Sequence, residues 1–346
     1  MDVLVVSLGS TGGLRTADEE LLASLRRAGA EAAIARAAPP RAVRTTMLTD
    51  LLWALAARRA AVLELRRTQA RALIYSSTTA ASFWPRPGAI RFDALSAGNR
   101  PGRHGLWQRP LEQRRLREAP LLLPWSDGAL PELRPRPHAD RTPPPIPSPK
   151  PALTLPVAIE SSLGSIAPSH ATGERDIAAF AYVANPAKKG LDRILDAWRS
   201  AGKPGEQLVL AGASERELRA HGYALPARGV RVVPMLPYDE YRALLRRTRA
   251  FVCAARREDY GIAQLEALAD GCMLVSTPSP GPYVALALAR SLDPRLIGED
   301  LAGALRIALD EPAPGYAAHA ARALAPFRRV ELDRVVAEQL LPRLLA

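Results

Sequence analysis

The sequence is poor in cysteine. Only two of its 346 residues are cysteines, Cys253 and Cys272, and each lies inside a short apolar stretch. Two thiols without a Cys-x2-Cys spacing suit neither a disulfide framework nor a thiolate metal site, so we expect both to be buried and reduced. The five histidines are scattered, with no pair at the spacing of a helical metal site. We therefore expect no bound metal ion.

Long apolar runs are missing as well. No stretch approaches the roughly 18 apolar residues that span a bilayer. The N-terminal sequence MDVLVVSLGS lacks the basic region and the long apolar stretch of a signal peptide, and its pattern indicates a buried strand instead. The sequence thus predicts a cytoplasmic protein.

Acidic residues are in deficit: 35 Asp and Glu stand against 47 Lys and Arg, which gives a net charge of +12. A positive field favours anionic partners such as nucleotides, phosphorylated sugars, anionic membranes or nucleic acid. No nucleic-acid-binding module is recognisable, so we expect no nucleic-acid partner. The segment GSTGG at 9–13 is neither a P-loop, because no Gly-Lys-Ser/Thr follows, nor a Gly-x-Gly-x-x-Gly dinucleotide fingerprint.

What the first half does contain is an alternation of strands and helices. A helix at 17–32 is expected after a turn at 9–13, and apolar runs predict strands at 3–8, 71–77, 89–94 and 119–126. This order predicts a parallel sheet covered on both faces. We assign residues 1–150 to an N-terminal domain and 151–175 to a linker, with one candidate strand at 152–159. Prolines already accumulate from residue 131, and they favour extended backbone there.

The second half repeats the rhythm more clearly. Strands are predicted at 177–184, 207–212, 230–235, 250–255 and 272–277. We assign residues 176–325 to a second Rossmann-like domain and 326–346 to a C-terminal helix that packs back toward the first domain. The predicted fold is α/β, with two doubly wound domains facing each other across a cleft. Ligands of such sheets bind beyond the carboxyl ends of the strands.

The stretch EDYGIAQLEALADG, residues 258–271, follows one of these predicted strand ends. Glu258 is placed on the loop and Gly261 at the start of the next helix, whose free N–H groups suit a phosphate. Glu266 is placed in the second turn of that helix, near the same crevice. One carboxylate could bind hydroxyls on one side of a diphosphate and the other could bind hydroxyls on the far side. Two solvated glutamates would give the same pattern, and the spacing alone does not separate these interpretations.

The stretch resembles the signature of the large family four of retaining GT-B glycosyltransferases. There, Glu-x-aromatic-Gly is followed by a second Glu and by Ala-x-Ala-x-Gly, and the matching residues here are Glu258, Tyr260-Gly261, Glu266, Ala267, Ala269 and Gly271. The segments at 182–198 and 230–258 resemble the parts of the family's donor domain that precede the signature. The segment at 9–29 resembles its Gly-Gly loop and first helix. The resemblance covers the C-terminal half well and the N-terminal half thinly.

The resemblance implies a role for each matching residue. Glu258 would bind donor-sugar hydroxyls near the reacting carbon, Glu266 would bind the ribose, and Lys189 would neutralise the donor diphosphate. Gly12 and Gly13 would bring backbone N–H groups to the diphosphate from the other domain. It also implies donor contacts at Asn185, Lys188, Met235, Leu236, Gly261, Ile262 and Leu265.

Three departures from the family pattern stand out. The family's arginine, about five residues before the lysine, is replaced by Ala184-Asn185, so Lys188 or an arginine from elsewhere would have to compensate. The usual His-Asp pair near the acceptor corresponds to Phe92-Asp93, and Asp93 is kept as a catalytic candidate, with His104 as a substitute for the missing histidine. Where the family has a glycine-rich turn after the signature, the chain has TPSPGPYVA at 277–285, in which Gly281 could approach a phosphate.

The resulting hypothesis is a metal-independent, retaining glycosyltransferase, a hexosyltransferase by family resemblance. Its donor would be a nucleotide sugar and its acceptor an unknown saccharide, lipid-linked or small molecule, with no further cofactor. Another GT-B enzyme, such as an epimerase or a phosphorylase, or a non-catalytic sugar-nucleotide-binding protein remains an alternative. The basic segment 100–118, with its six arginines, could lie on an anionic membrane at the inner face or form a solvated amphipathic helix.

Overall fold

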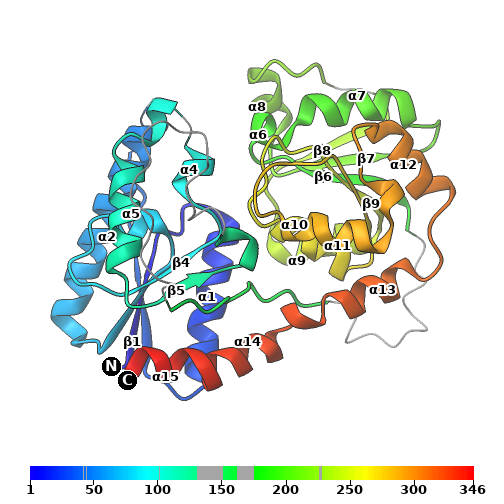
Figure 1. The fold of residues 1–346 in the computed structure, drawn as a ribbon. Coiled ribbons are helices and arrows are strands. Elements are labelled where there is room, and N and C mark those ends of the chain that lie inside the picture. Colours follow the sequence, from blue (N-terminus) through cyan, green and yellow to red (C-terminus); the bar gives the residue numbers. More distant parts are fainter. Residues whose placement is uncertain (42, 44, 101, 131–150, 162–174, 226–227) are drawn as a thin grey trace, which may run out of the picture. The chain divides into compact units, whose positions relative to one another are not determined.

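The chain folds into two compact units, each built around a parallel five-stranded sheet (Figure 1). The computed structural model describes residues 1–346 except 42, 44, 101, 131–150, 162–174 and 226–227. Unit 1 comprises Met1–Ala158 together with Phe327–Ala346, and unit 2 comprises Ile159–Pro326. The predicted α/β class with two doubly wound sheets is confirmed. Most of the predicted linker lies outside the described residues.

The sheet of unit 1 contains the four strands that the sequence predicts and one more. Its neighbouring strands pair in parallel. The unpredicted strand is β2, which begins at Ala32, the last residue of the expected helix. The order across the sheet is β2 (Ala32–Arg36), β1 (Val3–Ser7), β3 (Ala72–Tyr75), β4 (Ala89–Phe92) and β5 (Leu122–Pro124). Residues 151–155 run beside β5 but form only an isolated bridge, between Ala152 and Leu122.

Helices cover both faces of this sheet, as the continuous burial of β1, β3 and β4 requires. On one face, α1 (Gly12–Arg27) packs with the C-terminal helices through Leu21, Leu25 and Val336. On the other face, α2, α3 and α5 pack through Ala57, Ala81 and Leu116. The remaining helices of unit 1 are α2 (Thr46–Thr68), α3 (Thr78–Ala81), α4 (Ser96–Asn99), η1 (Gly102–Gly105), α5 (Gln108–Glu118), η2 (Asp127–Ala129), α14 (Arg329–Val335) and α15 (Leu341–Leu345).

Two helices of unit 1 differ from expectation. Helix α1 begins at Gly12 rather than after the turn at 9–13, because the Thr11 hydroxyl caps it by accepting the N–H of Leu14 at 3.3 Å. The C-terminal helix is not continuous, since a π-helical turn at Val336–Leu340 separates α14 from α15. An ion pair at 2.8 Å between Arg27 and Asp333 joins α1 to α14.

The sheet of unit 2 has a topological switch point at its centre, between β6 and β9. Strand β6 pairs with β7 on one side and with β9 on the other, so the connections leave these two strands in opposite directions. In an open parallel sheet, the loops after two such strands enclose the ligand crevice. The order is β10 (Met273–Ser276), β9 (Thr248–Cys253), β6 (Ile177–Tyr182), β7 (Leu208–Ala211) and β8 (Val230–Val233), at the five places that the sequence predicts.

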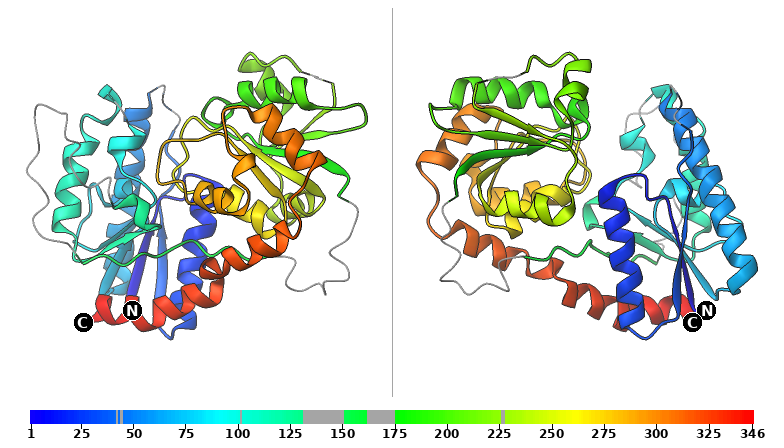
Figure 2. Two further views of the ribbon diagram at one scale, coloured as in Figure 1. Left: turned by 45° about the vertical axis from the view of Figure 1, so that its right-hand side comes forward. Right: turned by 180° about the vertical axis from the view of Figure 1, so that it is seen from behind.

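Helices also cover both faces of the second sheet, with α7 and α12 on one and α9, α10 and α11 on the other (Figures 1 and 2). None of the described helices has the length and apolar character that crossing a membrane requires. The helices of unit 2 are α6 (Pro186–Lys189), α7 (Leu191–Ala201), α8 (Glu215–Ala220), α9 (Tyr238–Arg246), α10 (Ile262–Ala269), α11 (Val284–Leu292), η6 (Pro294–Leu296), α12 (Leu301–Asp310), α13 (Tyr316–Ala323) and η7 (Ala325–Phe327), the last of which ends at the boundary with unit 1.

Candidate functional site

The loops after β6 and β9 meet directly at the switch point. The backbone N–H of Arg256 donates to the carbonyl of Lys188 at 2.9 Å. Gly190 has a φ of +67°, and a Cβ there would lie 2.0 Å from the carbonyl oxygen of Ala254. Only glycine allows this approach, because any side chain would clash with backbone that cannot move aside. The local sequence KKG therefore places the lysines of one loop against the acidic segment of the other.

Lys189 and Glu258 form an ion pair across this contact, with Nζ 2.6 Å from Oε2. Both side chains are largely buried. Burial alone would lower the pKa of Lys189, but the adjacent Glu258 carboxylate outweighs it and raises that pKa. Burial would likewise raise the pKa of Glu258, but Lys189 and a hydrogen bond from Gln264 hold it below its usual value. Both groups are therefore charged at neutral pH.

The backbone of Glu258 is fixed by the loop that follows β10. Its N–H donates to the carbonyl of Pro280 at 3.2 Å. Gly281 has a φ of +116°, and a Cβ at this position would lie 2.2 Å from the carbonyl oxygen of Glu258. The approach of Gly281 to a phosphate stays a prediction. The structure shows that this glycine packs on the backbone of Glu258, so the TPSPGPY segment positions that residue.

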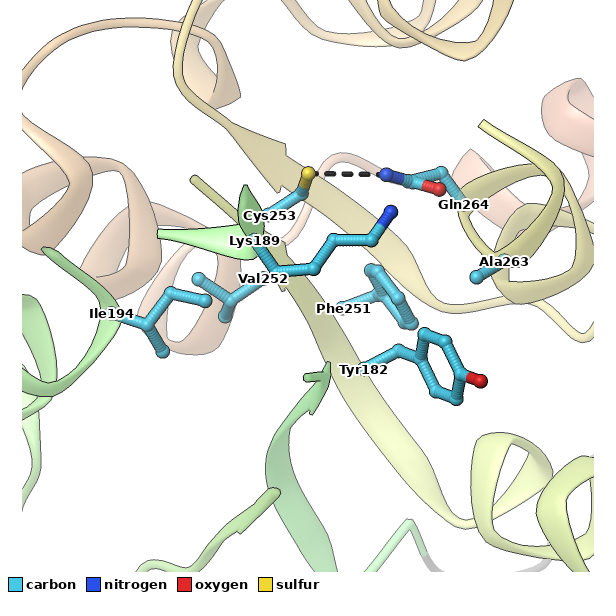
Figure 3. Close-up of a pocket in the computed structure, with 8 residues that line it drawn as sticks. All are labelled: Tyr182, Lys189, Ile194, Phe251, Val252, Cys253, Ala263 and Gln264. Carbon is cyan, nitrogen blue, oxygen red and sulfur yellow. Dashed lines mark hydrogen bonds between the residues drawn. The ribbon is translucent and has the colours of Figure 1, made fainter. Parts of the chain in front are cut away.

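A small pocket lies beside the ion pair and is lined by polar and apolar side chains (Figure 3). The Nε2 of Gln264, on α10, lies 3.1 Å from both Oε2 of Glu258 and Sγ of Cys253. The ammonium of Lys189 and the amide of Gln264 thus converge on one carboxylate oxygen. The lining residues are Tyr182, Lys189, Ile194, Phe251, Val252, Cys253, Ala263 and Gln264.

Glu266 lies on the same helix and belongs to a separate polar network. The hydroxyl of Tyr238 donates to Oε1 of Glu266 at 3.0 Å and accepts from Nη1 of Arg242 at 2.7 Å. Arg242 is itself held by two hydrogen bonds to the buried carboxylate of Asp270, at 2.5 and 2.8 Å. Burial raises the pKa of Glu266, and the charge of Arg242 and the hydroxyls of Tyr238 and Tyr241 offset this only in part.

If Glu266 binds a ribose, as the family resemblance implies, the replacement Tyr238→Phe should make nucleotide binding more sensitive to acid. Loss of the hydroxyl removes a donor to the ionised form of Glu266, so its pKa rises further above its ordinary value. The ionised carboxylate of Glu266 is the better acceptor for a hydrogen bond from a ribose hydroxyl. This ionised form is lost as the pH falls through the pKa. Calorimetric titration of a bound nucleoside diphosphate from pH 8 to pH 5 should show affinity falling at a higher pH in the variant than in the wild type. Coincident profiles would contradict this role for Tyr238.

The loop after β6, residues 183–190, is called the lysine loop, and its other predicted residues have partners close by in the structure. Asn185 caps α6, because its side chain accepts the N–H of Lys188 at 3.1 Å. Lys188 is half-exposed and lies 3.8 Å from Asp259, which also pairs with Arg257 at 2.7 Å. Arg256 and Arg257 lie on the loop after β9, next to the loop in which the family arginine is missing, and they pair with Asp192 and Asp259 at 2.7 Å each.

The predicted donor contacts outside this loop differ in exposure. Met235 is exposed, and its sulfur accepts the hydroxyl of Tyr182 at 3.7 Å. Leu236 and Ile262 are half-buried. Leu265 is fully buried in the core, which leaves its side chain no room for a ligand contact. Gly261 is the N-cap of α10, and the ring of Tyr283 occupies the side where a Cβ would point.

Four residues named from the sequence belong to unit 1. Gly12 and Gly13 form the first turn of α1. Asp93 follows β4, and its carboxylate accepts the N–H of Ala94 at 2.9 Å, which is a turn contact. His104 is exposed in η1. Among the described residues of both units, no group of three or more His, Cys, Asp or Glu side chains is arranged to hold a metal ion.

Sequence patterns missed the partners of the glutamates. Gln264 and Tyr238 belong to no motif, and each contacts its glutamate only because of the fold. The one available signal was the spacing of Tyr238 and Arg242, four residues apart on α9, which places their side chains on one helix face.

Comparisons with known proteins point to one family and one fold. Residues 167–311 match the model described as Glycosyl transferases group 1. No curated protein sequence matches the chain. Among solved structures, WaaG, a glycosyltransferase involved in lipopolysaccharide biosynthesis, is 14% identical with a TM-score of 0.69, covering 98% of this chain and 99% of its own.

Two further solved structures are similar. Anabaena HepE in complex with UDP and glucose is 13% identical, with a TM-score of 0.71 and coverage of 98% and 99%. Trehalose-6-phosphate synthase OtsA is also 13% identical, with a TM-score of 0.64 and coverage of 98% and 99%. At these identities the likeness establishes the fold, which is GT-B.

Proposed function

We propose that the protein transfers a sugar, a hexose by family resemblance, from a nucleoside diphosphate to an acceptor. The premise is that residues 167–311 match the model of the glycosyl transferases group 1 family. The family resemblance further supports retention of the anomeric configuration. The acceptor is a saccharide, a lipid-linked sugar or a small molecule, and no motif in the chain identifies which.

The observation that carries this proposal is the pairing of Lys189 with Glu258 at the switch point of unit 2. Breaking the bond to the anomeric carbon leaves negative charge on the departing diphosphate, and a fixed cation there lowers the barrier. Lys189 supplies that cation, while Glu258 can accept hydrogen bonds from sugar hydroxyls beside it. Glu266, one turn farther along α10 than Gly261 and Ile262, offers a second carboxylate for the ribose.

The donor can be identified by a thermal-shift screen. A ligand that binds only the folded state raises the melting temperature, so the correct nucleotide and its sugar should stand out. The first pair to test is UDP with UDP-glucose, because the similar HepE structure contains UDP and glucose. GDP with GDP-mannose and ADP with ADP-glucose complete the first set. A shift by none of these pairs would contradict the proposal. Binding without any transfer or hydrolysis of the sugar would favour a non-catalytic binding protein.

We expect transfer to continue in the presence of EDTA. The charge on the departing diphosphate is assigned to Lys189 and to the N-terminus of α10, so a divalent cation has no required place. The rate of donor consumption should be equal within about twofold with and without the chelator, a margin below one kcal/mol. Complete loss that magnesium or manganese restores would contradict metal independence.

We further propose a peripheral contact with anionic membranes, and the residues that support it differ from those predicted. Within the segment 100–118, helix α5 covers only Gln108–Glu118 and buries Gln108, Glu112 and Leu116, so it packs as an ordinary amphipathic helix, and Leu106 is exposed just before it. The outward face of α2 is more suitable. Leu48, Leu55 and Leu63 are 45%, 45% and 47% exposed, and exposed Arg59 and Arg66 share their helix face.

The triple replacement Leu48→Ser, Leu55→Ser and Leu63→Ser should weaken sedimentation with phosphatidylglycerol vesicles at least tenfold. Apolar insertion and basic attraction act together on such a surface, so removal of either weakens binding. The matched control is Val330→Ser, which changes an exposed apolar residue on α14. Equal binding by wild type and the triple variant, or no preference over phosphatidylcholine, would contradict this contact.

A further inference from the structure

Gln264 is a buried polar residue that the family motif leaves unspecified. It is only 2% exposed and lies between the two glutamates of the motif, on α10. Its amide nitrogen donates to Oε2 of Glu258 and to Sγ of Cys253, each at 3.1 Å. Its carbonyl oxygen Oε1 is buried and has no hydrogen-bond partner among the described residues. Figure 3 shows the amide group turned toward Cys253.

The orientation of this amide is determined by its neighbours. An ionised carboxylate can only accept hydrogen bonds, so the NH2 group of Gln264 has to face Glu258. The reversed orientation would place two acceptors against each other. Because Nε2 uses both of its hydrogens on Glu258 and Cys253, the carbonyl oxygen is left unpaired on the opposite side.

Stability alone does not account for a glutamine at this position. A buried carbonyl without a partner is unfavourable, whereas an apolar side chain of the same length would fill the space without leaving a polar atom unpaired. The amide therefore has its effect at Glu258. This differs from a core residue, whose replacement by an isosteric apolar side chain would have no consequence for a ligand.

The hydrogen bond between Gln264 and Glu258 becomes important when the donor binds. In the structure, Glu258 has two donors on one oxygen, Lys189 and Gln264. A diphosphate would draw the Lys189 ammonium away, and Glu258 would then be a buried carboxylate that has lost its main counter-charge. Gln264 is on a different element from Lys189, so its hydrogen bond persists after that exchange.

We propose that Gln264 is a positioning residue that holds the Glu258 carboxylate ready for the donor sugar when Lys189 engages the diphosphate. This inference rests on the proposed function, in which Glu258 binds sugar hydroxyls. It assigns to Gln264 the part of the affinity that the sugar adds to the diphosphate. That part is measured by the sugar ratio, which is the dissociation constant of the nucleoside diphosphate divided by that of its nucleotide sugar.

The groups that face Glu258 determine how this ratio depends on pH. Lys189 and Lys188 approach from the β6 loop, Tyr283 from the segment before α11, and Gln264 from α10. Burial raises the pKa of Glu258, and Lys189, Gln264 and Lys188 lower it. Loss of the Gln264 amide therefore raises this pKa, so that the ionised form is lost at a higher pH as acid is added.

The test uses Gln264→Met, which keeps the length of the side chain, with calorimetric titration of UDP and UDP-glucose or of the pair that gives the larger thermal shift. Diphosphate affinity should stay within about twofold, because Lys189 is intact. The sugar ratio should fall at least tenfold, and it should fall further as the pH is lowered from 8 to 5. The melting temperature should be unchanged or higher, because no unpaired carbonyl remains buried.

Gln264→Glu should show the opposite pH dependence. Two carboxylates at this distance repel each other at high pH and share a proton at lower pH, when the acid O–H can donate to Glu258. The sugar ratio of this variant should therefore rise as the pH falls. The control Cys253→Ala removes only the other acceptor of the amide and should leave the ratio within about threefold.

The outcomes separate this inference from the proposed function. An unchanged sugar ratio in Gln264→Met, or an equal loss in Cys253→Ala, would overturn the role of Gln264. If Glu258→Gln lowers the ratio and Gln264→Met does not, only this inference fails. If Glu258→Gln leaves the ratio unchanged, Glu258 does not bind the sugar and the proposed function fails with it.

Discussion

The replacement Glu258→Gln is expected to lower the rate of sugar transfer by about a hundredfold or more while the fold is retained. The carboxylate accepts hydrogen bonds from Lys189 and Gln264, and the TPSPGPY segment fixes the backbone of Glu258, so the carboxylate is preorganised before the donor arrives. Removing one preorganised electrostatic contact near the reacting carbon typically costs on the order of a hundred- to a thousandfold in rate. Donor consumption at saturating nucleotide sugar is the measurement.

A matched control for this variant exists in the same unit. Glu206 forms an ion pair with Arg306 at 2.7 Å, in a surface cluster with Lys203 and Asp310. Glu206→Gln makes the same chemical change to a paired glutamate outside the loops that follow β6 and β9, and its rate should stay within about twofold of the wild type. Nearly native turnover in Glu258→Gln would refute the assignment of this residue.

The second large effect concerns Lys189. Lys189→Ala should weaken nucleoside diphosphate binding by about ten- to a hundredfold, because a charge-assisted contact contributes roughly 1.5–3 kcal/mol. The variant also leaves Glu258 buried without its cation, which typically destabilises a fold by about 3–5 kcal/mol. The double variant Lys189→Ala with Glu258→Gln removes that unpaired charge, so calorimetry on both variants separates lost binding from lost stability.

Lys188→Ala is the matched control for the lysine loop. Lys188 is half-exposed, and its ion-pair partner is Asp259, so we expect a much smaller loss of diphosphate affinity. An equal loss in both single variants would mean that Lys188 has taken the role of the family's missing arginine. Unchanged affinity in Lys189→Ala would mean that this loop does not hold the donor.

The fold was predictable where the sequence is strongly periodic. The five strands of unit 2 are short, mostly apolar runs bounded by turns, and each was found within a few residues of its place. Strand β2 was missed because its sequence, Ala32–Arg36, is rich in alanine and continues the helical pattern of α1. The π-helical turn at Val336–Leu340 was equally invisible, since it keeps the same apolar spacing as a regular helix.

The candidate site was predictable only in its motif residues. The sequence placed Lys189 and Glu258 at strand ends but gave no sign that they pair, because contact between the two loops depends on strand order in the sheet. Gln264 and Tyr238 were missed for the same reason. The packing of Gly281 on the backbone of Glu258 could not be predicted either, because it depends on the path of a proline-rich loop that has no periodic signal.

The most direct test is a crystal structure of the whole chain with the nucleotide sugar that the thermal-shift screen selects. The account predicts a diphosphate oxygen within about 2.7–3.2 Å of the Lys189 ammonium, with the contact between Lys189 and Glu258 opened. It also predicts sugar hydroxyls on Glu258, which keeps its hydrogen bond to Gln264, and the ribose on Glu266. A nucleotide bound away from the loops after β6 and β9, with Lys189 and Glu258 still paired, would contradict it.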